Sequence, residues 1–128
     1  MIEVTMEQLI DFKNAGDFFE GTVIPLKGAY KINKIKKQVE DESDYYSEKF
    51  KGIVDDYAQK DDEGNVKFSD DGEQILIQQD KIDECNNALE ELQNFKVQIE
   101  NYDLALEDFG EDVKIAPEKL EPLMPFLS

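Results

Sequence analysis

The sequence predicts a mostly helical α+β fold: a long antiparallel helical hairpin with a small β element and short terminal helices. Two proline-free stretches carry apolar residues at the spacing of one helix face, and a charged segment with two glycines separates them. After the second stretch the spacing changes to alternation, which is typical of a strand. At 128 residues we expect a single domain in three parts, residues 1–25, 26–95 and 96–128.

The first part is predicted to begin with a short helix. Thr5 and Gln8 form a capping-box pattern, in which each side chain accepts a hydrogen bond from the backbone of the other residue. The pattern predicts a helix from about Met6 to Asn14 that ends at Gly16. An apolar connector follows.

The hairpin is predicted from two amphipathic helices. The first runs from Leu26 to about Gln59 and the second from about Glu73 to Phe95. The apolar residues at helical spacing are Ile32, Ile35, Val39, Tyr46, Phe50, Ile53 and Tyr57 in the first helix, and Leu76, Ile82, Cys85, Leu89, Leu92 and Phe95 in the second. Two such helices joined by a polar connector pack as an antiparallel pair. At about 1.5–3 kcal/mol for each buried side chain, we expect this seam to supply most of the stability.

The remaining segments are predicted from local patterns. Between the helices, residues 66–68 alternate between two glycine turns, so we expect a loop with a small strand pair. Alternation after the second helix predicts a half-buried strand from about Lys96 to Leu104, and the alternative continues that helix to residue 109. Pro117 suits the first turn of a final short helix.

The charge balance restricts the function. The chain has 31 acidic residues against 14 lysines, no arginine, no histidine, and a formal net charge of −17. Residues 1–60 carry nine lysines and twelve acids, whereas residues 61–128 carry five lysines and nineteen acids. Direct binding to nucleic acid or anionic membrane is not expected of such a surface. The asymmetry fits a basic protein partner, mimicry of nucleic acid, or simple solubility.

The residue types do not predict an enzyme. Without histidine no nucleophile–base pair can be proposed, and the single cysteine, Cys85, falls on the apolar stripe as a small buried hydrophobe. The acidic loop at residues 61–73 lacks EF-hand spacing, because counting back from either glycine places Gln59 or Lys67 at the first ligand position. We therefore expect no cofactor and no metal ion.

Acidic residues of the second half form the candidate partner-binding surface. Their spacing presents negative charge like a ladder of phosphates, which would occupy the nucleic-acid-binding groove of a target. The alternative is a solvated helix face. The candidate residues are Asp80, Asp83, Glu84, Glu90, Glu91, Glu100, Asp103, Glu107 and Asp108, followed by Glu111 and Asp112. A basic cluster consists of Lys27, Lys31, Lys34, Lys36 and Lys37. We expect it to pair with the chain's own acids, and the alternative is that it binds an acidic partner or nucleic acid.

Three stretches of the chain resemble a known family. They are PLKGAYKINKI at residues 25–35, DYAQKDDEGN at residues 56–65 and IAPEKLEPLMPFL at residues 115–127. With them, most of the chain resembles small proteins of bacteriophages and prophages of Gram-positive, low-GC bacteria, a family of unknown function. The resemblance implies a phage or prophage origin and supplies no catalytic residues.

The sequence thus predicts a non-enzymatic, phage-encoded acidic protein that binds a host or phage protein. One version inhibits a host nucleic-acid-binding or defence protein through its acidic face. The alternative is a structural or assembly component of the virion, in which the hairpin forms a homo-oligomer. The N-terminus lacks the charge and apolar run of a signal peptide, and the apolar runs are too short to span a membrane. We therefore expect the host cytoplasm, or the virion under the alternative.

Overall fold

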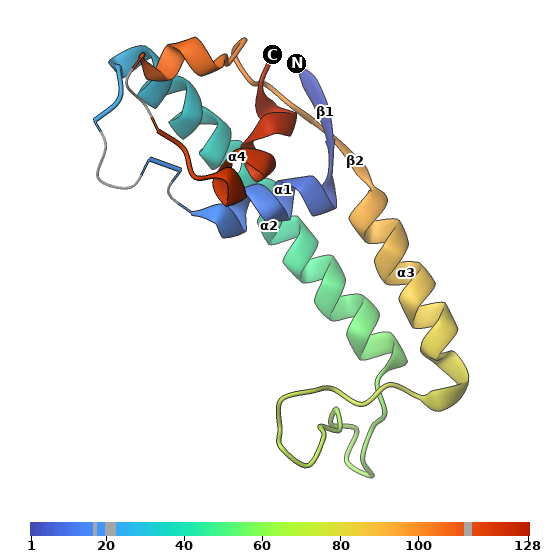
Figure 1. Ribbon diagram of the computed structural model, residues 1–128. Helices are drawn as coiled ribbons and strands as arrows, with labels where there is room; N and C mark the ends of the chain where they lie inside the picture. Colours follow the sequence, from blue (N-terminus) through green and yellow to red (C-terminus); the bar gives the residue numbers. More distant parts are fainter. Residues whose placement is uncertain (17, 20–22, 112–113) are drawn as a thin grey trace. The chain divides into compact units, whose positions relative to one another are not determined.

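The computed structural model describes residues 1–16, 18–19, 23–111 and 114–128. Its elements, labelled in Figure 1 where there is room, are β1 (Ile2–Thr5), α1 (Met6–Ala15), α2 (Leu26–Tyr57), η1 (Gln79–Lys81), α3 (Ile82–Asn94), β2 (Lys96–Ile99), η2 (Leu106–Phe109), α4 (Pro117–Leu123) and η3 (Met124–Phe126), where η denotes a 3-10 turn. The mostly helical α+β class is confirmed, with one small antiparallel sheet among the described residues.

The chain divides into two compact units. Unit 1 contains residues 1–44 and 95–128, and unit 2 contains residues 45–94. Helix α2 contributes its first turns to unit 1 and its last turns to unit 2. The organisation as one domain in three parts stays a prediction.

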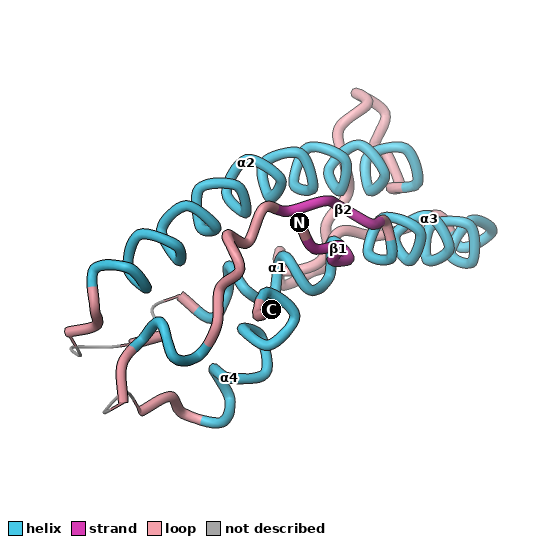
Figure 2. Tube along the Cα trace, turned by 90° about the horizontal axis from the view of Figure 1, so that it is seen from above, coloured by secondary structure: helices cyan, strands magenta, loops and turns pink. Residues whose placement is uncertain are grey.

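The sheet of unit 1 pairs the N-terminal strand with the segment after α3. Ile2 lies opposite Ile99 and Val4 opposite Val97, and Figure 2 shows the two strands side by side. The predicted strand after the second helix is therefore confirmed, and the alternative, in which that helix continues to residue 109, is not found. β2 ends at Ile99, earlier than predicted, because the chain turns at Tyr102, whose φ of 55° is in the left-handed region.

Helix α1 begins and ends as predicted. The Gln8 backbone donates to the Thr5 hydroxyl at 3.1 Å, and the Thr5 backbone donates to the Gln8 side chain at 2.9 Å. Together these bonds satisfy two backbone donors that the helix start would otherwise leave unpaired. Gly16, with φ of 70°, follows the last turn. Helix α4 also begins at Pro117 as predicted.

The apolar core of the described chain lies mainly in unit 1. It includes a series of phenylalanine rings: Phe12 lies 4.9 Å from Phe18 and 4.4 Å from Phe126, and Phe19 lies 4.5 Å from Phe109, centroid to centroid. Unit 1 also buries the apolar residues of the first half of α2, namely Ile32, Ile35 and Val39. These three residues therefore belong to the core of unit 1.

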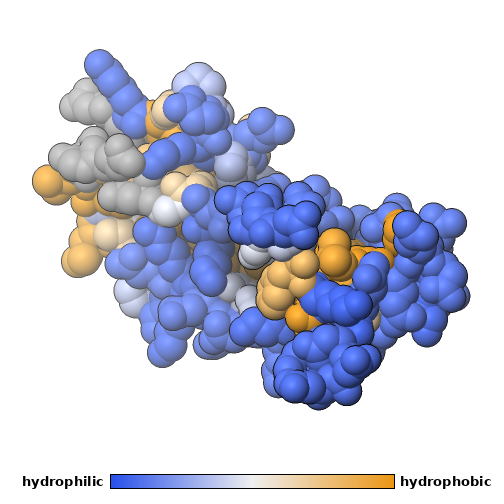
Figure 3. All heavy atoms as spheres, turned by 90° about the horizontal axis from the view of Figure 1, so that it is seen from below, coloured by the Kyte–Doolittle hydropathy of each residue, from blue (hydrophilic) through white to orange (hydrophobic). Residues whose placement is uncertain are grey.

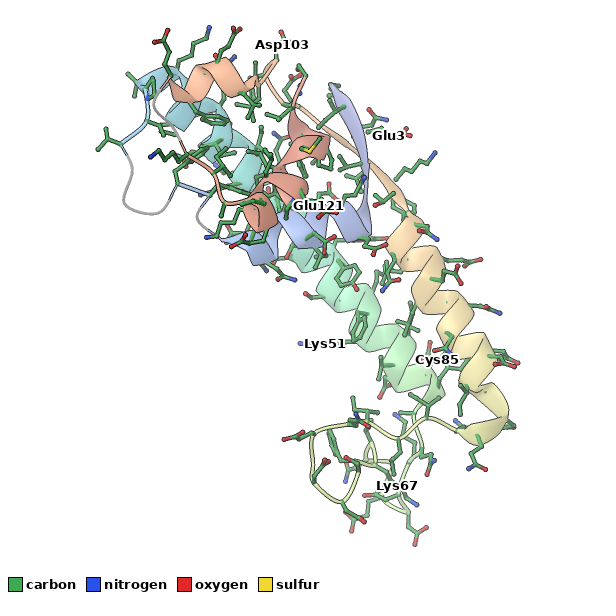
Figure 4. The ribbon with its side chains drawn as sticks, in the orientation of Figure 1. Glu3, Lys51, Lys67, Cys85, Asp103 and Glu121 are labelled. Carbon is green, nitrogen blue, oxygen red and sulfur yellow. The ribbon has the colours of Figure 1, made fainter. Side chains whose placement is uncertain are left out.

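Unit 2 contains the hairpin, in a shorter form than predicted. Figures 1 and 2 show α3 beside the last turns of α2, and the two run antiparallel. Cys85 is buried, on the side of α3 that faces α2 (Figure 4), as expected for a small hydrophobe. However, Cys85 and Ala58 are the only described apolar residues of unit 2 that are fully buried. The prediction that this seam supplies most of the stability was therefore wrong.

Residues 58–78 form what we call the tip of unit 2. Three short extended segments meet there, through the antiparallel bridges Ala58–Ile77, Lys60–Val66 and Phe68–Ile75. The backbone N–H groups form a closed ring of hydrogen bonds: Gln59 donates to Leu76, Leu76 to Lys67, and Lys67 to Gln59, at 2.8–3.0 Å. This pairing keeps the segment extended, so α3 begins at Ile82 and not near residue 73.

Two glycines of α2 provide a matched test of packing. A methyl group added at Gly28 would lie 2.3 Å from the backbone oxygen of Asp108 and 2.9 Å from the ring of Phe109, whereas one added at Gly52 would meet nothing within 4 Å. We expect Gly28→Ala to lower the free energy of unfolding by about 1–3 kcal/mol, as overpacking does. We expect Gly52→Ala to raise it by about 1 kcal/mol, since alanine favours the helix.

Both variants are to be compared with the unchanged protein by urea unfolding followed by circular dichroism. A Gly28→Ala variant as stable as the parent would contradict the close approach of α2 and η2.

Candidate protein-binding surface

Unit 2 carries a large exposed negative charge. Residues 45–94 include fourteen acidic residues and five lysines, and all fourteen acidic residues are exposed. The structure describes every residue of this unit, and the ion pair found within it joins Lys60 to Asp55. Thirteen carboxylates therefore face solvent without a lysine partner.

Five of the predicted site residues lie in unit 2 and are exposed. Asp80 is on η1, and the other four are on α3. Asp83 and Glu90 are two helical turns apart, as are Glu84 and Glu91, so all four share one side of the helix. Helical spacing places this side opposite Cys85 and the α2 seam. The predicted acidic face of the second helix is thus present.

The other four predicted site residues lie in unit 1. Asp103, in the turn after β2 (Figure 4), and Glu107 are exposed, and Glu100 is half-buried with its backbone paired to Gln38. The nine residues therefore come from two units. Of the two acids named beyond them, Glu111 is exposed, and Asp112 lies outside the described residues.

Asp108 is not part of an exposed surface. Only 7% of it is exposed, and Lys31 Nζ donates to its Oδ2 at 2.8 Å. The Ala105 backbone donates to the same oxygen at 3.0 Å, and Lys27 Nζ lies 3.5 Å from Oδ1. A buried carboxylate needs such partners, because burial of an unpaired charge is costly. The assignment of Asp108 to a partner-binding surface was wrong, since its charge is used inside unit 1.

The same contacts test the interpretation of the basic cluster. Lys27 and Lys31 pair with an acid of the same chain, as predicted for these two residues. Lys34 instead lies over the ring of Tyr30, 5.5 Å from its centroid. Lys27 and Lys31 therefore stabilise unit 1 through Asp108, whereas Lys34, Lys36 and Lys37 form no ion pair with a described residue, so the predicted pairing is found for two of the five lysines.

Sequence reasoning missed an apolar surface at the tip. Residues that bridge one another project their side chains from the same face, so Ala58, Val66, Phe68, Ile75 and Ile77 share one face, which we call the apolar tip face. Lys60, which bridges Val66, lies at the edge of this face and is paired with Asp55. At its inner end Ala58 is fully buried, and at its outer end Phe68 and Ile75 are 56% and 40% exposed. Figure 3 shows hydrophobic surface in this region, surrounded by hydrophilic side chains. The alternation at residues 66–68 was the only sequence signal.

No family model, no curated protein and no solved structure matches the chain. Among the described residues, no cluster of three acidic or cysteine side chains is suited to hold a metal ion. None of the described helices combines the length and apolar character needed to cross a membrane.

Asp108 gives a prediction with a defined pH dependence. Its pKa is lowered from 3.8, chiefly by the hydrogen bond from Lys31. A carboxylate whose folded pKa is depressed stabilises the fold above its ordinary pKa, and the contribution is lost as the pH falls through the folded value. We expect Asp108→Asn to lower the free energy of unfolding near neutral pH by about 1.5–3 kcal/mol. The difference from the parent should shrink below about pH 4.

Urea unfolding over a pH series measures this difference. Glu107→Gln, which changes an exposed neighbour, is the control and should leave stability nearly unchanged. A loss for Asp108→Asn that stays constant down to about pH 3 would argue against the ion pair as its cause.

Proposed function

We propose that this chain is a non-enzymatic, phage-encoded acidic protein that binds a cationic protein through unit 2. The observation that carries the proposal is the exposure of all fourteen acids of unit 2, of which one is paired with a lysine. Like charges at this density repel one another and oppose the compact state. A partner rich in lysine or arginine relieves that repulsion, so its binding would stabilise the folded unit as well as the complex.

The acidic side of α3 supports the more specific form of the proposal. Asp83, Glu84, Glu90 and Glu91 repeat negative charge along a rigid element, and a surface that normally binds phosphates would attract such a repeat. A host nucleic-acid-binding or defence protein is therefore the proposed target, inhibited by occupation of its basic groove. The resemblance of residues 25–35, 56–65 and 115–127 to phage proteins supports this setting, with the host cytoplasm as the place of action.

A second function is a structural or assembly role in the virion. One observation favours it: unit 2 exposes several large apolar side chains that a neighbouring copy could cover. They include Tyr45, Phe50 and Ile82, at 39–45% exposure. Contacts through such side chains resist salt, whereas contacts between exposed charges are screened at high ionic strength.

The test is an affinity pull-down of the tagged protein from infected host lysate at low and at high salt, read by mass spectrometry. We expect a basic host protein that is captured at low salt and released at high salt. Neutralising the α3 face, with Asp83→Asn, Glu84→Gln, Glu90→Gln and Glu91→Gln together, should abolish that capture.

A variant with four neutralised acids in unit 1 is the matched control and should capture the partner as the parent does. Its changes are Glu7→Gln, Asp11→Asn, Glu118→Gln and Glu121→Gln, all at exposed positions. Equal capture by both variants would contradict a role for the α3 face. Salt-resistant recovery of phage structural proteins, or of the protein itself, would favour the virion role.

A further inference from the structure

We infer that the apolar tip face is the docking point at which the cationic partner inserts an apolar side chain, so that the partner surface has an apolar centre and a rim of lysine or arginine. This inference rests on the proposed function, because it names the chemistry of the partner that unit 2 binds. It adds a contact that is independent of charge and therefore a source of specificity.

The first argument is the exposure of an adjacent apolar pair. Phe68 and Ile75 face each other across an antiparallel bridge and remain 56% and 40% exposed. The same face continues inward to Val66 and Ile77, which are half-buried. A continuous apolar strip that ends at the surface is a feature of binding sites, whereas apolar residues exposed singly are ordinary.

The second argument is that the backbone already holds this pair in place. The ring of hydrogen bonds among Gln59, Lys67 and Leu76 fixes the three segments. The Gln59 side chain adds a bond to the Ile77 carbonyl at 3.1 Å, and the Gln78 side chain adds one to the Ala58 carbonyl at 3.3 Å. A surface ordered before binding loses little conformational entropy in the complex.

The third argument is the charge around the pair. The two turns of the tip carry six exposed acids and no lysine, and side-chain hydrogen bonds hold both turns. Lys60, just before the first turn, is paired with Asp55 and so leaves the charge of these six acids unpaired. Asp61 accepts from the backbones of Glu63 and Asn65, both at 2.9 Å, and Asp71 accepts from the Ser69 hydroxyl and from the backbone of Glu73. The acids of the turns are Asp61, Asp62, Glu63, Asp70, Asp71 and Glu73.

These observations together define the chemistry of the partner that would cover the apolar tip face. An apolar contact enclosed by a polar rim is the usual anatomy of a protein–protein interface, in which a few central residues supply most of the affinity. Here the rim is acidic, so charge complementarity requires a basic rim on the partner. A polycation without apolar side chains would satisfy the rim and leave Phe68 and Ile75 exposed.

Two synthetic peptides test the inference on the full-length protein at low salt. The first contains lysine and leucine at amphipathic helical spacing, and the second has serine in place of each leucine, so the two carry equal charge. We expect the unchanged protein to bind the lysine–leucine peptide about tenfold or more tightly, a difference of about 1.4 kcal/mol or more, as expected for loss of a central apolar contact. Calorimetry or fluorescence anisotropy gives the two dissociation constants.

The decisive variant combines Phe68→Ser with Ile75→Thr, both at exposed positions, so the unit should stay folded. It should bind the two peptides equally, with unchanged affinity for the lysine–serine peptide. Phe50→Ser removes an apolar side chain that is 39% exposed outside the tip and should keep the preference. Phe68→Leu should also keep the preference for the lysine–leucine peptide, because leucine retains an apolar side chain at this position. This control distinguishes loss of the apolar contact from damage to the fold.

The outcomes separate the inference from the proposed function. If the tip variant prefers the lysine–leucine peptide as strongly as the unchanged protein does, the inference is overturned while electrostatic binding by unit 2 stands. If the unchanged protein binds neither peptide at low salt, the proposed function fails, and the inference fails with it.

Discussion

The phenylalanine cluster of unit 1 is the contact on which that unit depends. Phe12 joins α1 to η3 through Phe126 and to the following connector through Phe18, and Phe19 extends the contact to η2 through Phe109. Tilted ring pairs add to the gain from burial alone. The cluster connects elements from both ends of the sequence, and the β1–β2 pairing strengthens the same connection. Asp108, on η2, forms ion pairs with Lys27 and Lys31 in the first turns of α2. This buried charge therefore holds η2 against α2 beside the apolar core.

Local signals in the sequence were sufficient where one short segment determines the structure. The Thr5–Gln8 box and Pro117 each define a helix start from their own neighbours, and the seven-residue spacing of the α3 acids places them on one side. The apolar stripe of α2 shows the limit of periodicity. It identifies the apolar side of the helix, but it cannot tell that Val39 and Tyr46 belong to different compact units.

Pairings between distant residues were beyond the sequence argument. β1 is four residues long and finds its partner more than ninety positions away, so no window contains both strands. The tip is built from single bridges, too short for alternation to be convincing. No local sequence signal distinguishes Asp108 from the thirty other acidic residues, because its lysine partners lie on a helix far earlier in the chain. The acidic face of α3 was therefore predictable, whereas the buried carboxylate and the apolar tip face were not.

The closed ring of backbone bonds at the tip has a consequence for local opening. Each of Gln59, Lys67 and Leu76 is at once a donor to one member and an acceptor from the other. When any one of these bonds breaks, the two segments that it joined can move apart, and the other two bonds lose their alignment. The three bonds should therefore open as a cooperative unit. Hydrogen exchange at their three amides should then report one common free energy of opening, although they come from three separate stretches of sequence.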